Sequence, residues 1–494
     1  MGMKSKNAIL LILILLLGAS ARFYKLGSES FWLDEGATAL TLKKNDTMQI
    51  FGSILRDGKI LPDYYSYTHS LPLYYTILSI WADLFGMTEF SLRAFSALLG
   101  SLSLIAVFYL SRYLFDDKIA LLSTFLASIN LTLVWYSQEA RQYSYLLFLS
   151  LLSVIFLLKA LRHGKAMHII GFLAVNALII YSQITWILFI FFESVYALYV
   201  MYRDYSDKKY IHKKVIAAFF VIFILCLPII GRAIFSDTDI VRLYGKPEVQ
   251  DIAKFGVYLS GWLYPKETLR EKLYTSSFDF NLYEFALVSS FLLSTLLYGI
   301  LFLIGILKSF KHKSYIFLIS MFFLPVLLSL AISYIHPSIT VFMVKQVIYV
   351  IPVYLIFVSI GVLSSRFGNF LLAIIAISGL LSLHSYYLNT DKQQFREAAE
   401  FLKNNDEPVF LNIVSAQVAF RYYYGEKDNV IGVKDLEELK SNLNGIDSFW
   451  MLLTFTKYSD PENRIRDFLD ANYAPTEKKG FFDIELLHYE RRAP

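Results

Sequence analysis

Two adjacent carboxylates, Asp34 and Glu35, lie in the stretch FWLDEGA, shortly after the first long apolar run ends at Arg22. A carboxylate can act as a general base if it comes within hydrogen-bond reach of the proton that it abstracts. Adjacent acids in a loop are, taken alone, more often solvated than catalytic. Whether Asp34 and Glu35 are catalytic therefore has to be judged from the other polar residues of the sequence.

Further polar residues stand at the ends of other apolar runs or in the short segments between them. The candidate substrate-binding residues are His69, Arg93, Glu139, Arg141, Tyr143 and Lys345. Cationic side chains at the membrane surface can stabilise a leaving phosphate. Basic residues near the ends of membrane spans are also ordinary snorkelling anchors, and an exposed ion pair contributes little stability. Both interpretations stay open for each residue taken singly.

The composition restricts the class of protein that positions these residues. Of the 494 residues, 56% are apolar and 18% are charged, against about 45–50% and 25% in soluble domains. This indicates a polytopic α-helical membrane protein. A net charge of +5 gives no reason to expect nucleic acid as a partner. The single cysteine, Cys226, excludes a disulfide within the chain.

Eleven apolar runs are long enough to predict membrane spans, since a span takes about 20 residues. They cover residues 8–26, 92–114, 119–135, 143–161, 167–182, 184–201, 214–233, 283–307, 314–334, 344–363 and 369–388. The first run resembles a secretory signal. We interpret it as an uncleaved span, because Arg22 and Lys25 can snorkel and extend it.

The basic loops predict the orientation of the spans. Segments 162–165, 202–214, 308–313 and 364–369 all carry a positive excess and share one side with the N-terminus, which is the cytoplasmic side by the positive-inside rule. The opposite side receives segments 27–91, 136–142, 234–282, 334–340 and 389–494. All candidate residues therefore fall on the extracytoplasmic face of a multi-pass protein, which we expect in the plasma membrane.

The tail differs in kind from the spans. An amphipathic helix around REAAEFLK, a turn at 405–408 and apolar strands such as DSFWMLLTF and FFDIELLHYE predict a small α/β domain. We expect residues 1–388 to form a transmembrane domain with extracytoplasmic loops 27–91 and 234–282. Residues 389–494 would form the extracytoplasmic domain.

Four segments in order, FWLDEGA, THSLPLYY, SLRAFSALLG and SQEARQYSYLL, resemble the multi-spanning glycosyltransferases with a GT-C fold. The similarity is to the protein O-mannosyltransferase-like and aminoarabinose-transferase-like members, and it covers residues 1–200 best. It implies a helical bundle that moves a sugar from a polyprenyl-phosphate carrier to a hydroxyl of a protein, lipid or glycan. A divalent cation stays open as a cofactor, because the ligand count supports no metal assignment.

The resemblance also implies roles for single residues. Asp34 matches the catalytic acid of the family and Glu35 its supporting neighbour. His69 matches a segment of the first loop, and Glu139 and Arg141 match an acid and a base in the turn between two spans.

Two positions depart from the family pattern. Lys345-Gln346 stands where many relatives have Arg-Tyr, and Gln183 where many have His. A lysine can still meet a phosphate as a point charge.

The alternative function is a transporter or flippase for lipid-linked sugars. A transporter would be expected to carry polar sites near the middle of the membrane, on broken helices. An oligosaccharyltransferase or polymer ligase would use the same chemistry on a larger glycan. In a structural membrane scaffold, the acidic residues on the outer face could be substituted without loss of function.

Overall fold

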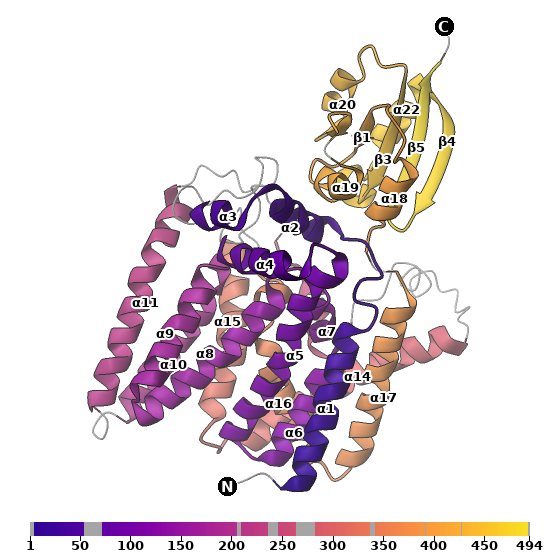
Figure 1. Cartoon of the computed structure of the whole chain (residues 1–494). Coiled ribbons are helices and arrows are strands. Elements are labelled where there is room, and N and C mark those ends of the chain that lie inside the picture. Colours follow the sequence, from indigo (N-terminus) through magenta and orange to yellow (C-terminus); the bar gives the residue numbers. More distant parts are fainter. Residues whose placement is uncertain are drawn as a thin grey trace. The chain divides into compact units, whose positions relative to one another are not determined.

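The structure is a computed structural model that describes residues 4–53, 72–204, 209–235, 246–262, 282–335, 341–390, 392–425 and 427–492. It is mostly helical, with one small sheet (Figure 1). The chain forms two compact units. The helical unit comprises the described parts of 1–24, 69–74 and 94–387, and the mixed unit those of 25–68, 75–93 and 388–494. The boundary expected at residue 388 stays a prediction.

Every apolar run identified in the sequence contains a helix. The bounds are α1 Ser5–Phe23, α5 Glu89–Leu114, α6 Asp117–Ile129, α7 Leu131–Ser137, α8 Tyr143–His163, α9 Ala166–Ile180, α10 Ile187–Arg203, α11 Lys209–Phe235, α14 Leu282–Ser309, α15 Tyr315–Ile335, α16 Val350–Ser364 and α17 Gly368–Leu388. Among the described residues there are also two short 3₁₀ helices, η2 Ile184–Trp186 and η3 Val344–Gln346, and helix α12 Val249–Leu259.

Eight helices among the described residues are long and apolar enough to cross a membrane, or nine if α6 and α7 form one bent span. Helices α9 and α16 are apolar but shorter. The chain is therefore a polytopic membrane protein, and the number of eleven spans stays a prediction.

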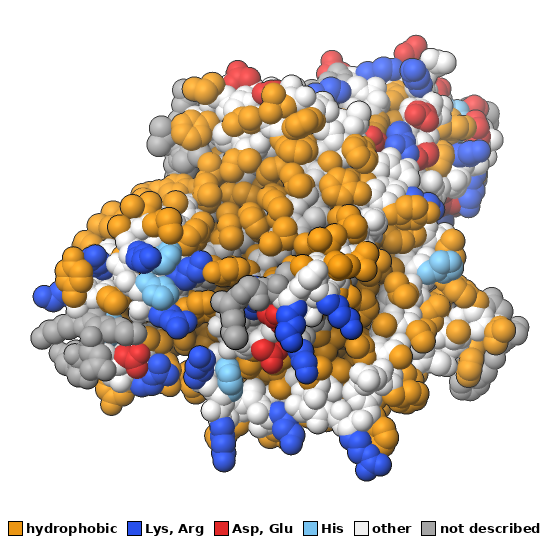
Figure 2. Space-filling model, turned by 60° about the horizontal axis from the view of Figure 1, so that its bottom comes forward, with side chains coloured by type: hydrophobic (Ala, Val, Ile, Leu, Met, Phe, Trp, Pro, Cys, Tyr) orange, Lys and Arg blue, Asp and Glu red, His pale blue; other side chains and the backbone are white. Residues whose placement is uncertain are grey.

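The outer flank of the helical unit is apolar. Large hydrophobic side chains such as Ile9, Leu16 and Phe220 are about 60% exposed, and Figure 2 shows hydrophobic side chains covering the sides of the helices. Such a surface would aggregate in water, but it suits contact with lipid chains.

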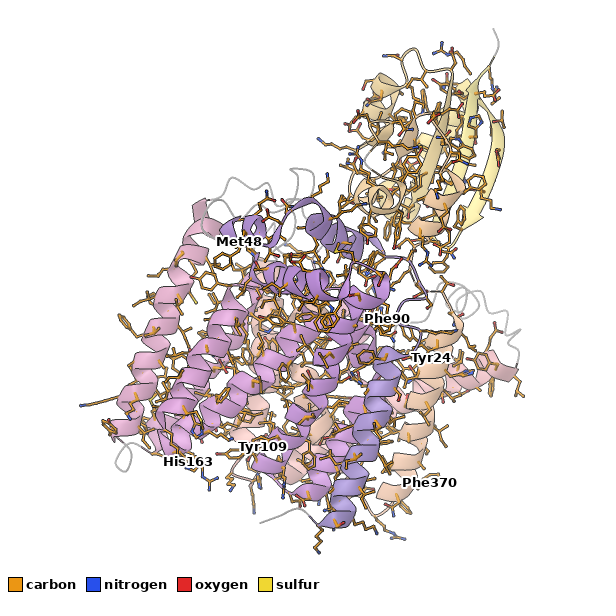
Figure 3. All side chains as sticks on the ribbon, in the orientation of Figure 1. Tyr24, Met48, Phe90, Tyr109, His163 and Phe370 are labelled. Atoms are coloured by element: carbon orange, nitrogen blue, oxygen red, sulfur yellow. The ribbon has the colours of Figure 1, made fainter. Side chains whose placement is uncertain are left out.

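The loop ends of the helical unit agree with the order of spans expected from the charges. In Figure 3, His163 at the end of α8 and Phe370 at the start of α17 lie toward the lower end of the unit, where α1 starts, and Tyr24, which follows the end of α1, lies above them. The basic segments 162–165 and 364–369 thus share an end with the start of α1. The side of the membrane that this end faces stays a prediction.

Helices α14 and α16 approach each other through glycines. A Cβ atom on Gly305 would lie 1.9 Å from the carbonyl oxygen of Phe357, and one on Gly361 would lie 2.1 Å from that of Leu301. Small residues allow this close approach. The van der Waals contacts that it creates hold the helices together in lipid, where the hydrophobic effect between helices is absent.

A break between α6 and α7 explains a buried arginine. The two helices meet at Asn130 with a bend of 60°, where the sequence indicates one continuous span. Carbonyl groups at the end of α6 thereby lose their helical donors. The guanidinium of Arg22 is 1% exposed and donates to the carbonyls of Ala127 (3.3 Å) and Ser128 (3.4 Å). Arg22 therefore does not snorkel to the surface, because its donors are needed at the bend.

The mixed unit joins the first loop to the tail. It contains α2 Leu33–Lys44, α3 Thr47–Ser53, most of α4 Pro72–Phe85, the first turn of α5 and the C-terminal domain. The C-terminal elements are α18 Phe395–Phe401, β1 Val409–Leu411, α19 Ala416–Tyr424, β2 Val430–Gly432, α20 Leu436–Asn442, β3 Ser448–Thr454, α21 Thr456–Ser459, α22 Arg464–Asn472, β4 Tyr473–Phe481 and β5 Ile484–Arg491.

The C-terminal domain is a mixed sheet between two apolar cores. The strand order is β2-β1-β3-β5-β4, with β1 parallel to β2 and β3, and β5 antiparallel to β3 and β4. Residues of α18 and α19 contribute to the core on one face, and residues of α20 and α22 to the core on the other. The predicted α/β region in the tail is confirmed.

Candidate functional site

The two adjacent acids lie in the first turn of α2. Trp32 precedes the helix in an extended conformation (φ −81°, ψ 176°), so the helical turn starts at Leu33. Asp34 and Glu35 then stand near the positive end of the helix dipole, and Lys43 and Lys44 occupy the last turn. Both placements stabilise the helix.

Glu35 is the centre of a buried ion cluster. Its carboxylate is fully buried and accepts hydrogen bonds from Nε of Arg93 at 2.8 Å and from Nη2 of Arg93 at 2.7 Å. Its Oε2 also accepts from Nζ of Lys392 at 3.0 Å. Arg93 and Lys392 are only 2% and 5% exposed. A buried carboxylate needs such partners, because burying a charge without them is very costly.

Arg93 also holds the chain that leads into α2. Its Nη1 donates to the carbonyls of Leu26 (3.1 Å) and Glu29 (2.7 Å), and its Nη2 to that of Ser30 (2.9 Å). The guanidinium carbon lies 5.3 Å from the centre of the Phe31 ring. The segment before α2 thus wraps around one guanidinium, which fixes both this segment and Glu35.

Asp34 has a different environment from its neighbour. Successive helical residues point about 100° apart because a turn takes 3.6 residues. With Glu35 directed into the buried cluster, Asp34 points elsewhere, and it is only half-buried. The first turn of α2 therefore offers one carboxylate that is fully enclosed by cations and one that solvent can reach.

The helical unit holds the other candidate residues in and near the turn between α7 and α8. Glu139, Arg141 and Tyr143 are all buried, and the carbonyl of Arg141 accepts from Oγ of Ser96 at 3.2 Å. Nζ of Lys345, which is half-buried in η3, lies 5.8 Å from the centre of the Tyr143 ring. Buried residues in so short a turn are not ordinary surface anchors.

The two departures from the family pattern lie side by side in one amide network. Nε2 of Gln142 donates to Oε1 of Gln183 at 3.2 Å, and Nε2 of Gln183 donates to Oε1 of Gln346 at 3.3 Å. Thr185 also donates to Oε1 of Gln346. The glutamines at these two positions are thus directly hydrogen-bonded to each other.

The structure brings Asp34, Glu35 and Arg93 together in the mixed unit. It brings Glu139, Arg141, Tyr143 and Lys345 together in the helical unit. His69 lies outside the described residues. That the two groups converge on one substrate stays a prediction. Within the described ranges, no group of three His, Cys, Asp or Glu side chains could hold a metal ion.

Lys392 belongs to the buried cluster around Glu35, and the sequence did not indicate it. It follows the last apolar run and is separated from Glu35 by 357 positions. Its local sequence, TDKQQF, is that of an ordinary polar linker. Lys392 could have been identified only if the contact between the tail and the first loop had been known.

The comparisons with known proteins agree with the fold. Residues 68–230 match the family described as dolichyl-phosphate-mannose-protein mannosyltransferase. ArnT from Cupriavidus metallidurans, in its apo crystal structure, is similar with a TM-score of 0.51 and 12% identity, over 98% of each chain. No curated protein matches the sequence of this chain.

A second solved structure is similar over nearly the whole chain. It is the archaeal oligosaccharyltransferase AglB from Archaeoglobus fulgidus, in complex with an inhibitory peptide and a dolichol-phosphate. The TM-score is 0.53 at 11% identity, covering 99% of this chain and 74% of that one. The GT-C fold expected from the sequence is confirmed, and the family match supports a membrane glycosyltransferase.

Proposed function

We propose that this chain is an integral-membrane glycosyltransferase that moves a sugar from a polyprenyl-phosphate carrier to a hydroxyl group on the extracytoplasmic face. The family match and the GT-C fold support the reaction class. The solved AglB complex contains a dolichol-phosphate, which supports a polyprenyl-phosphate donor here. The acceptor class is a protein, a lipid or a glycan, and membrane lipids are the other partners.

The main support for the proposal is the difference in burial between Asp34 and Glu35. Glu35 is enclosed by Arg93 and Lys392, whereas Asp34 on the same helical turn is half-buried. A general base must reach a substrate proton and must be held in place. Asp34 meets the first requirement through its exposure, and the buried cluster one residue away meets the second.

The reaction then follows from these roles. The acceptor oxygen forms a bond to the anomeric carbon of the sugar, while the bond from that carbon to the phosphate oxygen breaks. The hydroxyl proton goes to Asp34, and the electron pair of the broken bond leaves with the polyprenyl phosphate. Arg141 and Lys345 are the cations that we assign to the leaving phosphate. Arg93 already donates to Glu35 and to three carbonyls, so we assign it a positioning role.

The direct test is to give the purified full chain radiolabelled polyprenyl-phosphate sugars in detergent with membrane extract as the acceptor source. Wild-type protein should transfer the label, and Asp34→Asn should not. Transfer by Asp34→Asn at the wild-type rate would contradict the role of Asp34. A wild-type protein that transfers none of the offered sugars would contradict the reaction class.

The orientation has its own test, which uses single cysteines in a Cys226→Ala background. Ser441 in α20 and Ser364 at the end of α16 are both exposed and are replaced by cysteine one at a time. An impermeant thiol reagent applied to intact cells should label the cysteine at position 441 and spare that at 364. The reverse pattern would move the proposed site to the cytoplasmic face.

Two observations favour the alternative function, a transporter for lipid-linked sugars. Glu193 in α10 is fully buried and accepts from Oγ of Ser153 at 2.6 Å, and Nδ2 of Asn176 donates to the same Oγ at 2.7 Å. The bent α6–α7 pair is a broken helix, a feature of transporter sites. If reconstituted protein moved a lipid-linked sugar across a vesicle without forming a glycosylated product, this alternative would replace our proposal.

A further inference from the structure

The C-terminal domain packs directly on the helix that carries the acids. A Cβ atom on Gly36 in α2 would lie 2.4 Å from both Cα and Cβ of Ala419 in α19. Ala37 and Leu40 of α2 form a buried cluster with Val418. Because only a glycine at 36 permits this approach, the two helices are in backbone-to-backbone contact at the turn that carries Asp34.

Polar contacts fix the segment that precedes α2 to the same domain. Oγ of Ser30 donates to the carbonyl of Gln393 at 2.7 Å, and the backbone N–H of Phe31 donates to the hydroxyl of Tyr423 at 2.7 Å. That hydroxyl in turn donates to Glu89 at 2.8 Å. Burial, together with the charge of Glu89, raises the pKa of Tyr423 well above its ordinary value, so the hydroxyl keeps its proton.

The remaining contacts join the domain to the start of α5. Arg396 binds Glu89 at 3.0 Å and donates to the carbonyl of Ser28 at 3.0 Å. The hydroxyl of Tyr422 donates to the carbonyl of Met87 at 2.7 Å. The tail therefore holds α2, the segment before it and the start of α5, and Lys392 makes the one contact among these that reaches the carboxylate beside Asp34.

We propose that the C-terminal α/β domain is a positioning domain of the catalytic site, and that Lys392 is its positioning residue, acting on Asp34 through Glu35. The part of this inference that concerns rate rests on the proposed function. The part that concerns the placement of α2 does not. Lys392 touches no reacting atom in this scheme, so its loss should change the geometry of catalysis and leave the affinity for the donor intact.

The first arm of the test is kinetic. Lys392→Met should lower kcat by up to about 100-fold, the effect of a misplacement of about 1 Å, without raising KM for the polyprenyl-phosphate sugar that wild-type protein uses. Lys392→Arg keeps the charge and should restore most of the rate. Lys434→Met, at an exposed lysine of the same domain, is the matched control and should behave as wild type.

A double variant tests whether Lys392 acts through Glu35. If it does, Glu35→Gln/Lys392→Met should be no slower than Glu35→Gln alone, because Glu35→Gln already removes the ion pair through which Lys392 would act. Rate losses that multiply in the double variant would overturn this assignment. So would a Lys392→Met protein with an unchanged kcat.

The second arm measures the position of α2 and needs no activity. Amide hydrogen exchange across residues 33–44 should accelerate in Lys392→Met and in Gly36→Ala, in full-length monodisperse protein. It should stay as in wild type in Lys434→Met and in Gly52→Ala, since a Cβ on Gly52 meets no atom within 4 Å. Unchanged exchange in both test variants overturns the inference. Accelerated exchange in a protein without transferase activity would sustain the positioning domain and reject the proposed function.

Discussion

Glu35 and Asp34 are adjacent, but replacing them should produce different defects. Glu35→Gln should mainly lower stability, and Asp34→Asn should mainly lower the rate. Glu35→Gln removes the negative charge that pairs with both Arg93 and Lys392 in the buried cluster. Both cations are at most 5% exposed. Breaking a buried ion pair by removing one partner costs about 3–5 kcal/mol. This is a large part of the roughly 5–15 kcal/mol by which domains are stable.

Asp34→Asn should cost at most about 1 kcal/mol of stability, because it removes one charge near the N-terminus of α2. Its effect should fall on the rate. Loss of a general base lowers the rate by about 10²–10⁴, which corresponds to about 3–5.5 kcal/mol of barrier at 1.36 kcal/mol for each factor of ten.

The assay combines thermal unfolding of the purified full chain in detergent with transfer of labelled sugar by the same samples. We expect a clear fall in melting temperature for Glu35→Gln, together with weak transfer. For Asp34→Asn we expect a melting temperature close to that of wild type and a rate lower by at least about 100-fold. A stable Glu35→Gln protein without activity, beside a fully active Asp34→Asn protein, would show that the roles are exchanged.

Three further predictions concern separate parts of the molecule. Arg141→Ala should weaken donor affinity by about 1.5–3 kcal/mol through loss of a charge-assisted contact; an unchanged dissociation constant for the lipid-phosphate donor would make Arg141 a purely structural residue. Gly361→Ala should lower thermal stability by about 1–3 kcal/mol, since its Cβ would overlap a carbonyl of α14, whereas Gly299→Ala, with no neighbour within 4 Å, should not. Burial raises the pKa of Glu485, but the bonds and charges of Lys478 and Arg466 outweigh it and hold this pKa below its ordinary value. The folded state therefore gains stability above the ordinary carboxyl pKa of about 4.3 and loses it as the pH falls through the lower value; Glu485→Gln should remove that part of the acid loss in a melting series.

The helices of this protein could be predicted from hydropathy because each depends on local composition. The runs 143–161 and 369–388, for example, contain α8 and α17. The bend within 119–135 could not be predicted, since Asn130 alone does not reveal a break. Its stabilising partner, Arg22, lies on another helix, more than 100 positions away.

The candidate site was predictable only where a single segment carries it. Asp34 and Glu35 stand out as adjacent acids, but the sequence does not reveal that one is buried among cations and the other is half-exposed. That difference comes from Arg93 and Lys392, which approach from other parts of the chain. Gln183 and Gln346 are a second example. In the sequence they are two separate departures from the family pattern, and in the structure they are hydrogen-bonded to each other.

The separation of Lys392 from Glu35 also orders events during synthesis of the protein. Arg93 follows Glu35 by 58 positions, so their ion pair can form once the first loop and the start of α5 have been made. Lys392 and the surface of α19 are made some 300 residues later, after the last span. A nascent chain would therefore insert nearly all of its helices before the support for α2 exists. Under the proposed function, catalytic competence would arise only when the C-terminal domain has folded against α2, so products truncated before Lys392 would be inactive.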